Sequence, residues 1–210
     1  MRNRSENKIT IVMIRHGAAK SNLEHRYLGK TDEGLCEKGR EELLQYQREQ
    51  YYPPVDHLFV SPMKRCIQTA EILYPNRQPV LVEEWTEMDF GAFEGKNYRE
   101  LSGDTRYQAW IDCGGTCPFP EGESREAFIL RCEKGFQRML DCIRETERRQ
   151  KGDKLQETLG MIVHGGTIMA LLSRYGGGDY FDYQAANARG YLCTGFCSED
   201  GIYLTDIERL

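Results

Sequence analysis

KITIVMIRHG, residues 8–17, is the stretch of this sequence that decides the fold. Its first seven residues are apolar apart from one Lys and one Thr, which predicts a short strand buried on both faces. A second run of this kind, LGMIV at residues 159–163, is also followed by a histidine and a glycine. Strands buried on both faces need helices on either side of the sheet, so the two runs indicate an α/β fold.

The remaining pattern alternates short apolar runs with amphipathic stretches, which favours a mostly parallel sheet. Further strands are expected at residues 57–60, 79–82, 191–196 and 202–207, the last two forming a hairpin that turns at Glu199-Asp200-Gly201. Helices are expected at residues 37–50, 62–73, 124–149 and 167–175. We expect Ser61 to be the N-cap of the second helix, with Pro62 as its first residue.

Residues 90–156 contain no strand pattern. Glycine, proline and aromatic residues dominate up to Gly122, and a long amphipathic helix follows. We interpret residues 90–156 as a helical insertion over the C-terminal edge of the sheet, within a single domain that spans residues 1–210.

The composition excludes several classes of function. The chain has 210 residues, with 28 Lys and Arg against 33 Asp and Glu, so its net charge of −5 gives no general basic field for nucleic acid. No apolar run approaches the roughly 20 residues of a membrane helix, and we find no signal peptide or lipidation motif. We therefore expect a cytoplasmic protein that holds any anionic ligand by local positive charge.

The chain has eight cysteines, which we expect to be free thiols and mostly small buried apolar residues. Cys113 and Cys117 are separated by three residues, as are Cys193 and Cys197, so a four-cysteine zinc site is an alternative. Zinc sites mostly use tighter spacing, however, and we expect neither a metal nor a cofactor.

Residues with acid–base and anion-binding chemistry follow each predicted parallel strand. Arg15 and His16 end the first, Arg65 lies in the first helical turn after the second, and His164 ends the fourth. A group of carboxylates follows the third: Glu83, Glu84, Glu87, Asp89 and, further on, Glu94. Because ligands bind beyond the carboxyl ends of strands in open α/β sheets, we expect these side chains to meet.

Two arginines beside two histidines repel a metal cation and suit an anion. The guanidinium fork matches phosphate, and an imidazole can attack phosphorus to form a covalent intermediate. Arg15, Arg65 and a protonated His164 would stabilise the developing charge while His16 attacks. A carboxyl with a pKa raised by burial would protonate the leaving alkoxide. The residue types and spacing alone do not show which of the five carboxylates is this proton donor.

The ordered motifs IRHGAAKSN, SPMKR, EMDFGAFEG and VHGG, with RYLGKTDEGLCEKG and FPEGES, resemble the histidine phosphatase superfamily, also called phosphoglycerate mutase-like. The resemblance covers essentially the whole chain and is greatest to the small bacterial branch that includes α-ribazole phosphatase. It implies a three-layer α/β/α sandwich and metal-independent phosphoryl transfer through a phosphohistidine.

The resemblance also implies roles for individual residues. His16 is the expected nucleophile, and Glu87 is the expected proton donor. The residues expected to hold the phosphoryl group are Arg15, Asn22, Arg65 and His164, while Gly17 and Gly165 would permit tight turns and close backbone approach. The sequence departs from the branch at Ala18, Ala19, Gly34 and Cys36, and these departures bear on substrate identity more than on the reaction.

The expected substrate is a small phosphorylated metabolite, and the expected assembly is a monomer or homodimer. Tyr98 and Arg99 are our predicted substrate contacts because they follow the EMDFGAFEG segment, and His25 and Arg26 are further candidates. Aromatic residues of the insertion are candidates to line the pocket: Trp85, Phe90, Phe93, Tyr98, Tyr107, Trp110 and Phe119.

Three alternatives to a phosphatase using His16 remain open. A mutase would pass the phosphoryl group to a second hydroxyl, although the insertion looks short for a glycolytic mutase. A cysteine-dependent phosphatase would use Cys132 and Arg138, but these lie in a helical pattern and not after a strand. A non-catalytic phosphate-binding module would share the fold, although such proteins typically lose the nucleophile or an arginine.

Overall fold

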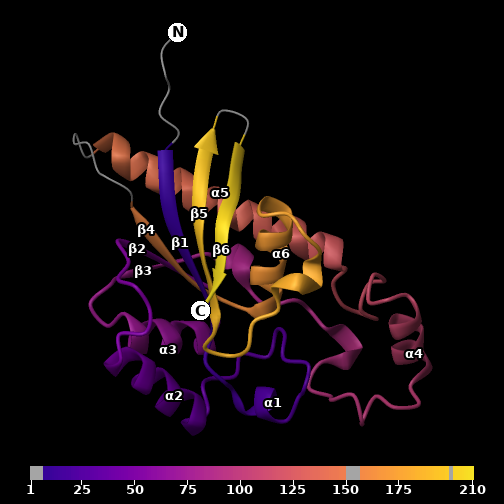
Figure 1. Cartoon of the computed structure of the whole chain (residues 1–210). Helices are drawn as coiled ribbons and strands as arrows, with labels where there is room; N and C mark the ends of the chain where they lie inside the picture. The colour runs from indigo at the N-terminus through magenta and orange to yellow at the C-terminus, as the bar shows by residue number, and fades with distance from the viewer. Residues whose placement is uncertain (1–6, 150–156, 199–200) are drawn as a thin grey trace.

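The computed structural model describes residues 7–149, 157–198 and 201–210, whose strands form one sheet in the order β3-β2-β4-β1-β5-β6 (Figure 1). The strands are β1 (Asn7–Arg15), β2 (His57–Val60), β3 (Pro79–Leu81), β4 (Thr158–Val163), β5 (Gly190–Ser198) and β6 (Gly201–Arg209). The first four pair in parallel, and β5 and β6 are antiparallel. The predicted mostly parallel α/β sheet is therefore confirmed.

Helices cover both faces of this sheet. They are α1 (Lys20–Leu23), α2 (Glu37–Arg48), α3 (Lys64–Leu73), α4 (Thr105–Asp112), α5 (Arg125–Arg149) and α6 (Gly165–Tyr175). Short 3₁₀ turns are η1 (Glu83–Trp85), η2 (Gly91–Phe93) and η3 (Tyr180–Tyr183). In Figure 1, α5 crosses behind β1, β5 and β6, while α2 and α3 lie together at the lower left.

The alternation of side chains along β1 produces two cores. Val12 and Ile14 pack with residues of α2 and α3, whereas Ile11 and Met13 pack with residues of α5 and α6. Successive residues of a strand point to opposite faces, so one buried strand joins both cores into three layers. This explains why the run at residues 8–14 is almost continuously apolar.

The helix after β2 starts later than predicted. Its N-cap is Met63, which makes no side-chain capping bond, so the prediction of Ser61 as N-cap and Pro62 as first helical residue was wrong. The Ser61 hydroxyl instead lies 2.8 Å from His164 Nε2. A local capping rule does not account for a partner 103 residues away.

The region predicted to be an insertion divides into two parts. Residues 90–124 contain η2, α4 and connecting turns, whereas Phe128, Phe136 and Met139 of α5 belong to a core of the sheet. The helix α5 therefore forms part of a helical layer that packs on the sheet. Residues 150–156, at the end of the predicted insertion, lie outside the described part of the chain.

The cysteines differ in part from the prediction. Cys113 and Cys117 are paired as a disulfide, which contradicts the expectation of free thiols for this pair. Positive φ angles at Gly114 and Gly115, 63° and 67°, reverse the chain after α4 and bring the two Cα atoms within 6.1 Å. Five other cysteines are free thiols: Cys36, Cys66, Cys132, Cys142 and Cys193. The side chain of Cys197 lies outside the described ones.

Within the described residues, none of the helices combines the length and apolar character needed to cross a membrane.

Candidate active site

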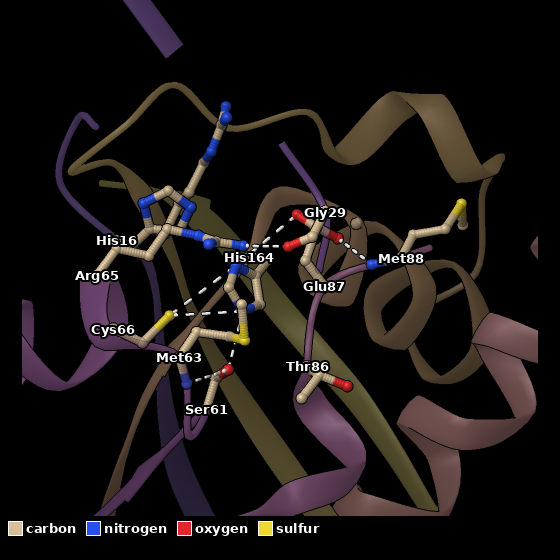
Figure 2. Close-up of polar contacts among 12 residues, drawn as sticks. His16, Gly29, Ser61, Met63, Arg65, Cys66, Thr86, Glu87, Met88 and His164 are labelled. Carbon is tan, nitrogen blue, oxygen red and sulfur yellow. Dashed lines mark hydrogen bonds and ion pairs between the residues drawn. The ribbon is translucent and has the colours of Figure 1, made fainter. Parts of the chain in front are cut away.

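The carboxyl ends of β1, β2 and β4 bring the predicted catalytic side chains together. The parallel register pairs Arg15 with Val163, and the backbone N–H of His16 donates to the Val163 carbonyl at 3.0 Å. The next residue in β4's direction is His164, whose ring centroid lies 5.1 Å from that of His16. Figure 2 shows both rings beside the side chains of Arg65 and Glu87. We call this cluster the reaction site.

His16 is held as a neutral imidazole. Its side chain is buried, and Nδ1 lies 2.8 Å from the Gly17 carbonyl oxygen, which can only accept a hydrogen bond. The proton is therefore on Nδ1, and Nε2 keeps its lone pair. Burial, followed by the charges of Arg65 and Arg15, lowers the pKa of His16 well below its ordinary value. The ring stays unprotonated near neutral pH.

Arg65 is fully buried, and two of its three nitrogens have protein partners. Its terminal nitrogens donate to the carbonyls of Thr31 and Gly29, both at 2.9 Å. A Cβ on Gly29 would collide with the Met88 carbonyl, so the close approach of this loop requires glycine. The Nε atom of Arg65 is buried and has no hydrogen-bond partner in the protein.

Arg15 shows the same feature as Arg65. One terminal nitrogen donates to the Ala185 carbonyl at 2.8 Å, while its Nε is buried without a partner. Buried polar groups are nearly always paired, and two orphaned guanidinium donors on residues whose charges act on His16 are therefore informative. Oxygens of an anion satisfy such donors.

His164 is buried between Ser61 and Glu87. Its Nε2 lies 2.8 Å from the Ser61 hydroxyl, and its Nδ1 lies 3.8 Å from Glu87 Oε2. Burial, then the charges of Arg65 and His16, lowers the pKa of His164 well below its ordinary value. In the free protein His164 is therefore a neutral hydrogen-bonding group, whereas the sequence argument assumed a protonated one.

Glu87 is distinguished from its neighbouring carboxylates by position. It is buried, its Oε1 accepts the Met88 backbone N–H at 2.9 Å, and burial raises its pKa. The other carboxylates point elsewhere: Glu83 is exposed, Glu84 pairs with Arg138, Asp89 pairs with Lys30, and Glu94 accepts backbone N–H groups of Gly29 and Thr31. Of these five groups, Glu87 is the one beside His164.

Arg131 fixes the segment that carries Glu87, and sequence reasoning missed it. Its NH1 donates to the carbonyls of Glu84 at 2.7 Å and Thr86 at 2.8 Å, and its NH2 lies 3.4 Å from the Glu87 carbonyl. The Glu123 carboxylate accepts from the same guanidinium at 2.8 and 3.1 Å. Glu123 belongs to the motif FPEGES, so that motif contained the available signal.

Asn22 and Arg15 both line a cavity of about 420 Å³, to which His25 and Arg26 also contribute. Its Oδ1 accepts the Ala19 backbone N–H at 3.0 Å and lies 3.3 Å from Asn187 Nδ2. Asn187 also donates to the His16 carbonyl at 3.1 Å. Sequence reasoning missed Asn187 because a single asparagine in a loop carries no distinguishing pattern.

Tyr98 and Arg99 are not brought to the site. Neither lines the two cavities that adjoin Arg15, and Tyr98 is 55% exposed. The Arg99 guanidinium lies 5.6 Å from the Tyr98 ring centroid, so the two side chains pack on each other at the surface. Proximity in sequence to Glu87 is therefore a poor guide to which side chains line these cavities.

The structural requirement for glycine at positions 17 and 165 differs from the predicted one. Neither Gly17 nor Gly165 has a positive φ. A Cβ on Gly17 would lie 2.6 Å from Leu43 Cδ1, whereas one on Gly165 would make an ordinary 3.5 Å contact with Arg15 Nε. Gly166 is the more restricted helix residue, because its Cβ would lie 2.9 Å from Glu87 Oε1.

A cavity of about 310 Å³, which we call the aromatic pocket, opens from the reaction site. Arg15, Glu87, Gly165 and Gly166 line one end of it. Its aromatic lining residues are Tyr27, Phe90, Trp110, Phe119, Tyr180 and Phe181. The structure thus places three of the seven aromatic candidates in the lining, whereas Trp85 and Phe93 are fully buried in the core.

The cysteine-dependent alternative does not fit the structure. Cys132 lies inside α5, is fully buried in the core, and its carbonyl accepts a hydrogen bond from Trp85 Nε1. Burial raises the pKa of its thiol, which disfavours the reactive thiolate. Arg138, its proposed partner, pairs with Glu84 at the surface.

This chain is similar to known proteins in both sequence and fold. The family model described as histidine phosphatase superfamily (branch 1) matches residues 11–191. Phosphoglycerate mutase-like protein 4 of Arabidopsis thaliana is 28% identical over 171 residues, covering 78% of this chain and 70% of the relative. Adenosylcobalamin/alpha-ribazole phosphatase of Escherichia coli is 28% identical over 133 residues, covering 61% and 66%. A solved mycobacterial glucosyl-3-phosphoglycerate phosphatase shares the fold, with a TM-score of 0.78, 21% identity, and coverage of 96% and 98%.

Proposed function

From the membership of this chain in the histidine phosphatase superfamily and the geometry around His16, we propose that it hydrolyses a small phosphomonoester through a phosphohistidine. The observation that carries the proposal is a neutral His16 with a free Nε2 beside two buried arginine Nε donors that have no protein partner. A phosphoryl group supplies both the electrophile for that nitrogen and the acceptor oxygens for those donors.

In the first proposed step, His16 Nε2 attacks phosphorus and the bond from phosphorus to the ester oxygen breaks. Arg15, Arg65, Asn22 and a neutral His164 would donate hydrogen bonds to the phosphoryl oxygens, whose charge grows in the transition state. The departing alkoxide takes the proton of Glu87, whose buried carboxyl has a raised pKa. The step leaves a phosphohistidine, a free alcohol and the Glu87 carboxylate.

In the second proposed step, the Glu87 carboxylate removes a proton from water, and the resulting oxygen attacks the phosphohistidine. The bond between phosphorus and His16 breaks, which returns the neutral imidazole, protonated Glu87 and inorganic phosphate. The positive charge for both steps comes from the arginines, so the proposed chemistry requires no metal ion.

Phosphate release separates hydrolysis from its alternatives. We expect the full chain to release phosphate from several phosphomonoesters in the presence of EDTA, with p-nitrophenyl phosphate as the first probe. With 3-phosphoglycerate we expect phosphate release without sustained isomerisation. Sustained isomerisation with negligible phosphate would instead identify a mutase, and an absence of turnover from pH 5 to 8 would favour a phosphate-binding module.

A further inference from the structure

The aromatic pocket adjoins the side of the reaction site from which the alcohol departs. Glu87, the proposed proton donor, lines the inner end of the pocket together with Arg15 and Gly165. A proton donor must lie beside the ester oxygen, so the body of the alcohol extends from that oxygen into the aromatic pocket. The walls of this pocket are therefore the surfaces that discriminate between substrates.

The walls are aromatic side chains that fix one another. Trp110 and Phe119 are stacked, with ring centroids 4.8 Å apart. Phe119 also contacts the rings of Phe90 at 5.0 Å and Tyr27 at 6.1 Å, both at steep angles. Such walls offer ring faces and edges, which favour a flat aromatic body over a saturated one of equal size.

A second positive charge, besides that of Arg15, lies in the largely apolar lining. Arg125, the first residue of α5, lines the pocket, and its guanidinium lies 5.5 Å from the Tyr180 ring centroid and 5.8 Å from that of Phe181. None of the ion pairs found in the described ranges includes Arg125, although acidic residues are abundant in the chain. A guanidinium resting on two rings, without a carboxylate partner, is suited to bind an anionic group of a ligand.

We propose that the aromatic pocket selects phosphomonoesters whose alcohol carries a flat aromatic ring system and, beyond the ring, a second anionic group that Arg125 binds. This inference rests on the proposed hydrolysis at His16 and names the substrate class of the same site. The ring occupies the space between Phe119 and Tyr180, and the second anion accepts hydrogen bonds from the guanidinium.

A matched set of synthetic esters tests the ring and the anion separately. 2-Naphthylmethyl phosphate and decalinylmethyl phosphate have primary alcohols of similar acidity, so chemistry at phosphorus is held nearly constant. We expect the naphthyl ester to have a kcat/KM about fivefold higher. Adding a carboxylate, as in 6-carboxy-2-naphthylmethyl phosphate, is expected to raise kcat/KM by about tenfold more.

Single variants assign each preference to its residue. Arg125→Gln is expected to abolish the preference for the carboxylated ester, and Trp110→Leu is expected to reduce the ratio of naphthyl to decalinyl ester to about one. Arg99→Gln is the matched control, because Arg99 also lies over a tyrosine ring but lines neither cavity beside Arg15. This control is expected to preserve both ratios.

The outcomes separate this inference from the proposed hydrolysis. Equal kcat/KM values for the three esters, with phosphate released from each, would overturn the substrate class and leave hydrolysis intact. A carboxylate preference that survives Arg125→Gln would overturn the assignment of the anion to Arg125. A protein that releases no phosphate from any ester or from p-nitrophenyl phosphate would overturn both proposals.

Discussion

The reaction site and the aromatic pocket share Arg15 and Glu87, yet they are built in different ways. The reaction site consists of side chains at the ends of neighbouring parallel strands, so the sheet register sets the distance between His16 and His164. The aromatic pocket takes its walls from separate segments outside the sheet, including the Tyr27 loop, α4 and η3. In the proposed mechanism the chemistry thus depends on the strands of the sheet, and selectivity depends on segments that can differ without disturbing the sheet.

This contrast predicts that reaction-site variants lower turnover of all substrates, whereas pocket variants change the ratios between substrates. The largest effect is expected for His16→Ala, which removes the nucleophile and should lower kcat by at least about 10⁴-fold for every ester. Steady-state phosphate release measures this loss. His57→Gln is the control, since His57 begins β2 at the opposite end from Ser61. A His16→Ala protein that keeps a tenth of normal activity would contradict the role of His16 as the nucleophile.

Glu87→Gln is expected to lower kcat/KM for alkyl esters by about 10²–10⁴-fold, and much less for p-nitrophenyl phosphate, because a good leaving group needs no proton. Glu84→Gln is the control, since Glu84 pairs with Arg138 away from His164. Equal losses for alkyl and aryl esters would assign the acid to another residue.

The pH dependence follows from the same two groups. The proposed mechanism requires a neutral His16 and a protonated Glu87. Burial raises the pKa of Glu87, so the alkaline limb lies above the ordinary carboxyl range; the lowered pKa of His16 places the acidic limb below 6.5. The pH profile of kcat/KM for an alkyl ester should lose its alkaline limb in Glu87→Gln. An unchanged alkaline limb in that variant contradicts the assignment.

Arg131→Met tests whether the Glu87 segment must be held in place. Loss of the bonds to the Glu84 and Thr86 carbonyls should lower kcat by about 10- to 100-fold with little change in KM. Arg131→Met also removes a positive charge that holds the pKa of Glu87 down, so the alkaline limb should move to higher pH. Arg131→Lys should restore part of the activity, and Arg138→Met, at an exposed ion pair, should have no effect. A loss in Arg131→Met with an unchanged pH profile would indicate a structural role only.

The smallest effect is expected from two adjacent glycines. An alanine Cβ at position 166 would lie 2.9 Å from Glu87 Oε1 and 3.1 Å from Phe128, so Gly166→Ala should displace the acid and lower kcat/KM by about tenfold for alkyl esters. Gly165→Ala places its Cβ 3.5 Å from Arg15 Nε and should change kcat/KM by no more than about twofold. The measurement is kcat/KM of both variants with one alkyl ester. Equal values for the two variants would contradict the predicted difference.

The sequence predicts the reaction site better than the pocket for a physical reason. Strands at residues 8–14 and 159–163 are read from local apolar runs, and parallel pairing then brings the residues that follow them together without further information. The role of Ser61 could not be predicted from local sequence. Its hydroxyl contacts His164, which only the pairing of the strands brings near, and it does not cap the following helix.

The pocket depends on how irregular segments pack, which local patterns do not encode. Tyr98 follows the Glu87 segment yet lies exposed, whereas Tyr180, 82 residues further along, lines the pocket. Phe90, Trp110 and Phe119 were identified as candidates by residue type, but so were Trp85 and Phe93, which are buried in the core. Residue type alone does not separate a pocket wall from a core side chain.

Trapping the covalent intermediate tests whether His16 carries the phosphoryl group. The full chain is mixed with ³²P-labelled ester, quenched in alkali within a single turnover, and digested for peptide mapping. We expect label that is stable to alkali, labile to acid and carried by His16, and that is absent from His16→Ala. Label on another residue, or a burst of alcohol release with no phosphorylated histidine, would contradict this expectation.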